Sequence, residues 1–186
     1  MKRLVLFPIA LVLVTGLALG LHQAFAQSPT PDSLEAMALP RDAFPNGFLL
    51  EEGPITPQDL SQPLNPDTVA SAGMDRIVLQ FQEGYHVAVI VWDGSSSLFV
   101  GHYLYRYADD LQAQRALEQL TASLSFQKDP DGWTGFWKDS EGGSLAVRLQ
   151  VRGPVVTMLI VNGLSESSTR AALDHATRAL APRPAR

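Results

Sequence analysis

The stretch LFVGHYLYRYADDLQAQRALEQLTASL, residues 98–124, joins a strand pattern to a helix pattern. Residues 99–107 are dense in aromatic and β-branched side chains and contain no proline, which is typical of a β-strand. Alternation along a strand places Tyr103 and Tyr105 on one face and His102 and Arg106 on the other. Asp109 is in position to cap a helix, because apolar residues then recur at helical spacing, at Ala113, Ala116, Leu117, Leu120 and Leu124.

The same pattern returns 56 residues later, since Thr169 corresponds to Ala113 and Ser165 to the cap at Asp109. Residues 155–163 take the place of the strand. We interpret residues 75–124 and 131–180 as two copies of a strand, strand, strand, helix unit. The predicted fold class is therefore α+β, in which two βββα repeats form one mainly antiparallel sheet of about six strands with two helices packed on one face.

The N-terminal segment predicts export. Lys2 and Arg3 precede an apolar run over residues 4–21, and Ala24 and Ala26 have the spacing that signal peptidase prefers. We expect a signal peptide over residues 1–26, no stable membrane anchor after its cleavage, and a periplasmic or extracellular protein. The apolar run is long enough to leave an N-terminal anchor with the domain facing outside as the alternative.

Composition limits the partners of the exported chain. Without Lys2 and Arg3, the 14 basic residues fall to 12 against 19 acidic ones, a formal charge of −7. An acidic chain is poorly suited to bind nucleic acid or an anionic membrane. The sequence has no cysteine, so stability must come from an apolar core and not from disulfides.

The region before the repeats divides into a linker and a leader. Residues 27–38 are predicted to be a flexible linker, and a single domain then spans residues 39–182, with a tail over residues 183–186. Residues 39–66 form a proline-rich leader, which we expect to contain a short strand at residues 47–52 and to lie against the repeats. The motif Pro45-Asn46-Gly47-Phe48 at its start resembles that of uncharacterised exported bacterial α+β domains, which carry no assigned activity. The resemblance implies export and a single α+β domain, and it transfers no functional residues.

The strands carry more apolar surface than two helices on one face can cover. Residues 85–92 and 155–161 are apolar on both strand faces, a pattern that requires two covers. The second cover is predicted to be the leader, a second subunit or partner protein, or a small ligand.

The candidate ligand or partner face consists of two groups of residues. His102 and Arg106 are placed to contact an anion, and the aromatic side chains Trp92, Tyr103 and Tyr105 are placed to stack on a ligand or partner, although packing in the core is the competing interpretation for the aromatic residues. No catalytic residue, no metal ligand and no cofactor is predicted, because no motif for acid–base, phosphate or metal chemistry is present. Asp129-Pro130-Asp131-Gly132 lacks most positions of a calcium loop and is interpreted as a turn.

Three functions follow from this pattern. The first is an exported non-catalytic domain that binds a protein partner, which includes a homodimer, or a small ligand through one sheet face. The second is a secreted hydrolase that combines a serine of residues 95–97 with His86 or His102. The third is a periplasmic chaperone or assembly factor.

Overall fold

The computed structural model of the chain describes residues 32–56, 80–92, 94, 96–123, 125–138 and 142–181. The predicted signal peptide, the first residues of the predicted linker, residues 57–79 and the tail over residues 183–186 lie outside the described residues. Most of the first strand of the predicted repeat over residues 75–124 therefore lies outside them as well. The described residues show an α+β fold with one antiparallel sheet, as the sequence predicts.

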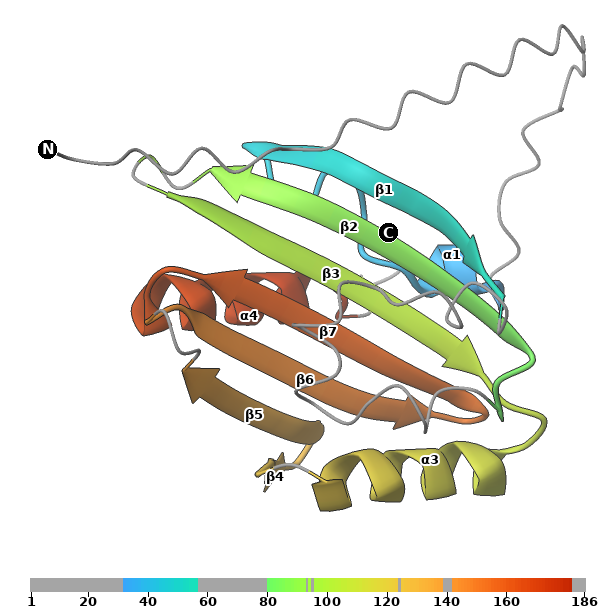
Figure 1. The fold of residues 1–186 in the computed structure, drawn as a ribbon. Helices are drawn as coiled ribbons and strands as arrows, with labels where there is room; N and C mark the ends of the chain where they lie inside the picture. The colour runs from blue at the N-terminus through green and yellow to red at the C-terminus, as the bar shows by residue number, and fades with distance from the viewer. Residues whose placement is uncertain are drawn as a thin grey trace, which may run out of the picture.

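Seven strands form this sheet in the order β1-β2-β3-β7-β6-β5-β4 (Figure 1). Two of these strands, β1 of the leader at one edge and the short β4 at the other, are not among the predicted six, whereas the first strand of the predicted repeat over residues 75–124 is not among the described ones. Two meanders meet at its centre, where β3 pairs antiparallel with β7 from Phe99↔Asn162 to Arg106↔Val155. The strand bounds are β1 (Gly47–Ile55), β2 (Glu83–Trp92), β3 (Ser97–Arg106), β4 (Gln127–Asp129), β5 (Gly132–Lys138), β6 (Ser144–Arg152) and β7 (Val155–Gly163).

Three helices complete the described chain: α1 (Leu34–Met37), α3 (Asp110–Ser123) and α4 (Glu166–Ala179). Both predicted caps are confirmed. The Gln112 backbone N–H donates to Asp109 Oδ1 at 2.8 Å, and the Ser168 backbone N–H donates to Ser165 Oγ at 3.2 Å. These bonds satisfy backbone donors that a helix N-terminus leaves free, so each helix begins where its cap residue permits.

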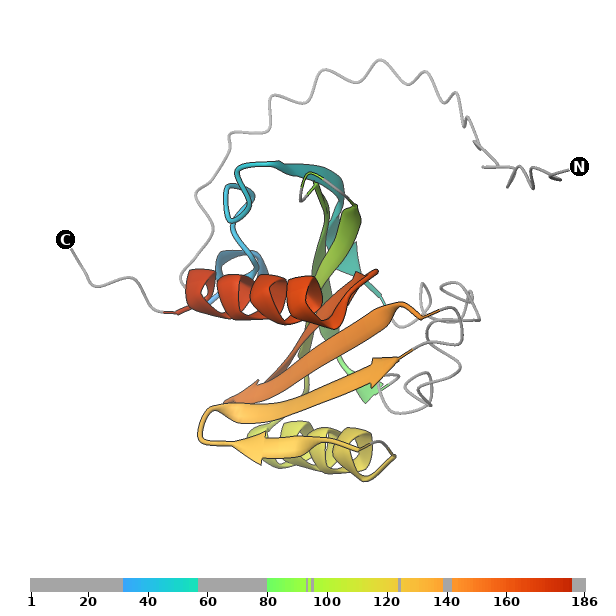
Figure 2. The same cartoon turned by 90° about the vertical axis from the view of Figure 1, so that its left-hand side faces the viewer.

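The prediction that both long helices pack on one face is wrong. Helix α3 packs in one cluster with Tyr105, Val147 and Val156, whereas α4 packs in another with Ala146 and Val161. Neighbouring residues of one strand point to opposite faces, so the two clusters lie on opposite sides of the sheet. Figure 2 shows α4 and α3 on the two sides of the β6–β7 part of the sheet.

The register of the central strands explains this arrangement. Tyr103 pairs with Met158 and therefore shares a face with it, whereas the 56-residue offset makes Leu159 the counterpart of Tyr103. Residues of β3 and their counterparts in β7, 56 positions later, thus point to opposite faces of the sheet. The helices that follow these strands, α3 and α4, accordingly cover opposite faces. The two-repeat βββα arrangement is not confirmed.

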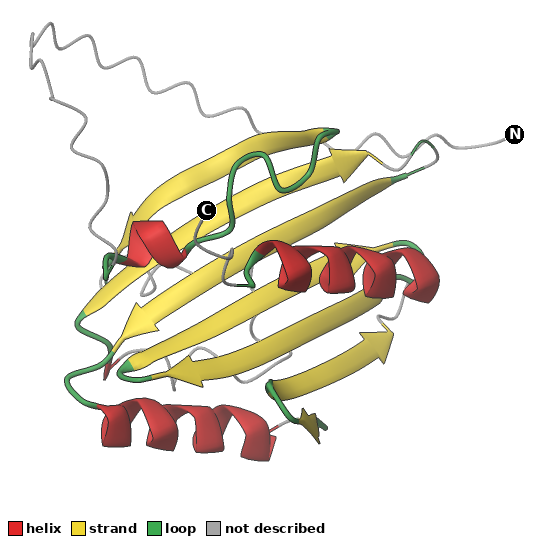
Figure 3. Cartoon of the chain, turned by 180° about the vertical axis from the view of Figure 1, so that it is seen from behind, coloured by secondary structure: helices red, strands yellow, loops and turns green. Residues whose placement is uncertain are grey.

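Helix α1 and the start of the leader add a second cover on the α4 side of the sheet. Leu34 of α1 is 1% exposed and packs with Leu104 and Val155. Leu39 and Phe44 join the cluster that contains α4. Figure 3 shows α1 and the segment after it on the same side of the sheet as α4. The prediction of a flexible linker is therefore wrong for residues 33–38, which pack on the domain.

Candidate functional site

The face of the sheet that carries α3 remains uncovered by any described helix over β1, β2 and the first half of β3. Figure 1 looks onto this face. Phe48, Ile90 and Phe99 lie in directly paired positions across the three strands. Phe48 is 71% exposed and Trp92 58% exposed, while Ile90, Phe99 and Tyr103 are half-buried. We call these five residues the open face.

A glycine shapes the floor of the open face. The Phe99 and Tyr103 rings lie over Gly101, because a Cβ atom on Gly101 would come within 3.0 Å of Phe99 Cε1 and 2.7 Å of Tyr103 Cε2. His86 stacks on Tyr103 with 6.0 Å between ring centroids and 12° between ring planes. The rings therefore form a continuous aromatic layer along β2 and β3, the type of surface that contributes most apolar contact area.

The rim of the open face is acidic. Glu51 pairs with Ala88 in the β1–β2 ladder, so its side chain points to this face. Its side chain is 69% exposed, and Glu51 Oε2 lies 3.5 Å from His86 Nε2. Burial, with a smaller contribution from the Glu51 charge, raises the pKa of Tyr103, so its phenol stays neutral. An apolar centre with a carboxylate at its edge favours a contact surface that is apolar and basic.

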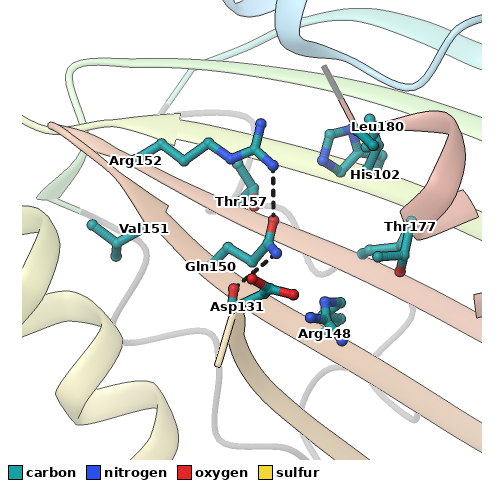
Figure 4. Close-up of a pocket in the computed structure, with 11 residues that line it drawn as sticks. His102, Asp131, Arg148, Gln150, Val151, Arg152, Thr157, Thr177 and Leu180 are labelled. Carbon is teal, nitrogen blue, oxygen red and sulfur yellow. Dashed lines mark hydrogen bonds between the residues drawn. The ribbon is translucent and has the colours of Figure 1, made fainter. Parts of the chain in front are cut away.

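A second candidate site lies on the opposite face of the sheet. A cavity of about 300 Å³ is bounded by β3, β6, β7, the C-terminal end of α4 and the β4–β5 turn (Figure 4). Polar side chains dominate its strand walls, and they include His102, Arg148, Gln150, Arg152 and Thr157. The sequence shows residues 148, 150 and 152 as alternating polar positions on one strand face. It does not show that His102 and Thr157 of two other strands lie beside them.

His102 is the most buried polar side chain of this cavity, at 1% exposed. Its Nδ1 accepts a hydrogen bond of 3.0 Å from the Leu39 backbone N–H, so the neutral ring carries its proton on Nε2. Burial, together with the nearby positive charge of Arg152, lowers the pKa of His102 to about 3. His102 is therefore a neutral hydrogen-bond donor at physiological pH.

Arg148 is held in place by the turn between β4 and β5. Its Nη1 and Nη2 atoms donate to the two oxygens of Asp129, each at 3.1 Å, and Thr134 Oγ1 donates to Asp129 Oδ2. This geometry is that of a bidentate arginine–carboxylate pair. Residues 129–132 form a turn, as the sequence predicts, and the Asp129 oxygens are occupied by Arg148. Within the described ranges, no cluster of three His, Cys, Asp or Glu residues is placed to hold a metal ion.

The five predicted site residues do not form one site. Trp92 and Tyr103 lie on the open face, but Tyr105 is 3% exposed and packs in the cluster with α3. His102 lies in the cavity on the other side of the sheet. Arg106 shares that side, yet its Nε is 3.2 Å from Glu83 Oε2 and its Nη2 donates to the Asp32 carbonyl. Alternation along the strands does not single out Phe48 and Phe99 of the open face. Helix α3 buries Tyr105 and leaves Phe48 and Phe99 accessible, and the strand pattern carries no information on where α3 packs.

Ser97 does not lie beside either histidine of the predicted hydrolase pairing. Ser97 and His102 are five residues apart on one strand, a separation of roughly 17 Å at about 3.3 Å per residue. His86 pairs with Tyr103 and therefore points to the face opposite His102. Ser95 lies outside the described residues.

No protein-family model and no curated protein matches the sequence. The structure is similar to the crystal structure of the extracellular domain of PknH from Mycobacterium tuberculosis, with a TM-score of 0.55 and 11% sequence identity. The similarity covers 83% of this chain and 96% of that domain. At this identity the match shows a shared fold. None of the helices among the described residues has the length and apolar character needed to cross a membrane.

Proposed function

We propose that this chain is an exported, non-catalytic domain that binds a partner protein through the open face. The observation that carries the proposal is the contiguous apolar surface formed by Phe48, Ile90, Trp92, Phe99 and Tyr103 across three strands. Large apolar patches of this kind are typical of protein interaction sites. The signal-like N-terminal sequence supports export, as does the shared fold with an extracellular domain.

The partner is a different protein that presents an apolar surface with a Lys or Arg at its edge. Glu51 at the rim selects for such a basic residue, because an opposite charge at an interface steers association and suppresses wrong partners. A second copy of the chain would instead bring another Glu51 and another formal charge of −7 to the contact. An anionic lipid surface would be repelled in the same way.

Site-specific photo-cross-linking tests this proposal in cells that make the protein. A photoreactive amino acid at Phe48 reports on the open face, and the same amino acid at Leu111, which is 59% exposed on α3, is the matched control. We expect a cross-linked product from position 48 that is absent from position 111. The partner identified in that product is then purified, and Trp92→Ser is expected to weaken its binding at least tenfold, the effect of losing about 1.4 kcal/mol at an aromatic contact.

Two outcomes contradict the proposal. Equal products from positions 48 and 111 show that the open face has no preference for a partner, and a product made only of two copies of the chain shows self-association. A set of many unrelated partners at position 48 favours the chaperone or assembly-factor function over a dedicated binding domain.

A further inference from the structure

We infer that the cavity beside the C-terminal end of α4 binds a small carboxylic acid that also has a hydroxyl or ammonium group, such as an α-hydroxy or α-amino acid. This site lies on the opposite side of the sheet from the open face. It does not depend on the proposed protein partner.

Hydrogen-bond donors dominate one end of the cavity. Arg152 is exposed, and its hydrogen bond within the described chain is a long one, 3.4 Å from Nη2 to Gln150 Oε1. Its guanidinium group therefore retains donors for a carboxylate. The neutral ring of His102 adds an Nε2 donor, because its Nδ1 accepts from Leu39. Figure 4 shows the side chains of Arg152 and His102 in the same half of the view, above Gln150 and Asp131.

Arg148 lines the cavity but offers it little as a donor. Its Nη1 and Nη2 atoms are taken by Asp129, and its Nε atom is buried from solvent, so a ligand in the cavity does not reach it. The Asp129 carboxylate also balances the Arg148 charge. Arg152 is therefore the cation that this part of the cavity offers to an anion.

Acceptors lie along the other rim. The Asp131 side chain lines the cavity, and the Gln150 amide links its strand to the turn by donating to the Asp131 carbonyl at 2.8 Å. Thr177 also lines the cavity, and its hydroxyl donates to the Leu173 carbonyl at 2.8 Å, so its oxygen can act only as an acceptor for a ligand. These groups favour a hydrogen-bond donor on the ligand and disfavour a second negative charge. The combination matches one carboxylate plus one hydroxyl or ammonium group.

The size of the cavity agrees with a small molecule. A volume of about 300 Å³ is at the lower end of the range for ligand sites. Leu159 and Leu180 provide the apolar part of the wall, which leaves room for a short side chain on the ligand.

Calorimetric titration of the purified chain with four probes tests the inference: L-alanine, L-lactate, acetate and inorganic phosphate. We expect L-alanine or L-lactate to bind more tightly than acetate, and acetate more tightly than phosphate. The Arg152→Gln variant is expected to bind the best probe roughly 10- to 100-fold more weakly, which is the range for losing a charge-assisted hydrogen bond. Arg178→Gln, an exposed arginine in the last turn of α4 that does not line the cavity, is the matched control and should bind normally.

Nuclear magnetic resonance gives a second readout that does not depend on affinity. A nitrogen–proton correlation of the His102 ring should show the proton on Nε2, and binding of the best probe should shift the Nε2 signal. The inference is overturned if none of the four probes binds, if phosphate binds most tightly, or if the two arginine variants lose the same affinity. Because Arg152 is exposed, its replacement leaves the fold intact and keeps this comparison decisive.

Discussion

His102 illustrates what alternation along a strand can and cannot predict about a residue. The sequence correctly places His102 and Arg106 on one strand face. Alternation carries no information on the leader, which lies on that face and supplies the Leu39 N–H to His102 Nδ1. The predicted pair therefore does not bind one anion together, because His102 is buried in the cavity wall and Arg106 is engaged by Glu83 and the Asp32 carbonyl.

Burial of His102 predicts a loss of stability at acid pH. The unfolded chain binds a proton at this histidine below pH ~6.5, whereas the folded chain, with a pKa of about 3, does not. The unfolded state therefore binds more protons, and stability falls as the pH falls from about 6.5 toward 3. On acidification from pH 7 to pH 5, His102 should lower the free energy of unfolding by about 2 kcal/mol.

The measurement is urea unfolding at both pH values for the natural chain and for His102→Asn, whose side-chain oxygen can still accept from Leu39. The variant should lose less stability on acidification than the natural chain. An unchanged pH slope in the variant would show that other groups account for the acid sensitivity.

The elements divide into those that local sequence determines and those that it does not. The strand at residues 155–163 and the caps at Asp109 and Ser165 are predicted correctly, because cap chemistry and side-chain alternation act within a few residues. The side on which each helix packs depends on the pairing of Tyr103 with Met158, a contact between residues far apart in the chain. A shift of one residue in that register reverses the face, and the sequence pattern does not contain the register.

The two caps should contribute independently to stability. Asp109→Ala and Ser165→Ala are each expected to destabilise the chain by about 1 kcal/mol, because each removes the acceptor for a backbone N–H. The helices lie on opposite faces, so the double variant should equal the sum of the single variants within about 0.5 kcal/mol. Urea unfolding measures all three, with Ser125→Ala in an exposed turn as a control that should change stability by less than about 0.5 kcal/mol. A clear departure from additivity would contradict the separation of α3 and α4.

For the whole molecule, the sequence predicts that the sheet has more apolar surface than the two long helices can cover. It does not predict which segment covers which part of the sheet. Helix α1 and the leader cover the α4 side through Leu34, Leu39 and Phe44, and α3 covers the β6–β7 part of the other side. No described helix covers the open face, because residues such as Phe48 and Trp92 lie beyond the reach of α3. The sequence predicts that the leader lies against the repeats, but its proline-rich composition indicates irregular chain and does not specify which sheet face the leader covers.

The packing of α1 predicts a large effect of a residue in the predicted linker. Leu34→Ala should destabilise the chain by about 2–5 kcal/mol, because Leu34 is buried against Leu104 and Val155. Leu50→Ala, at a site that is 56% exposed, removes the same atoms and should change the free energy of unfolding by less than about 0.5 kcal/mol. Thermal unfolding of both variants provides the comparison. Equal melting temperatures would mean that α1 does not contribute to the core.

The central position of β7 has a consequence for the order in which the chain is made. Strand β3 is complete by Arg106, but its partner β7 begins only at Val155, so one edge of β3 has no neighbour while the intervening residues are synthesised. Pairing of such distant segments is slow compared with closure of a hairpin. A chain that stops short of residue 155 therefore presents an unprotected aromatic strand, and this nascent state is the one most prone to aggregate.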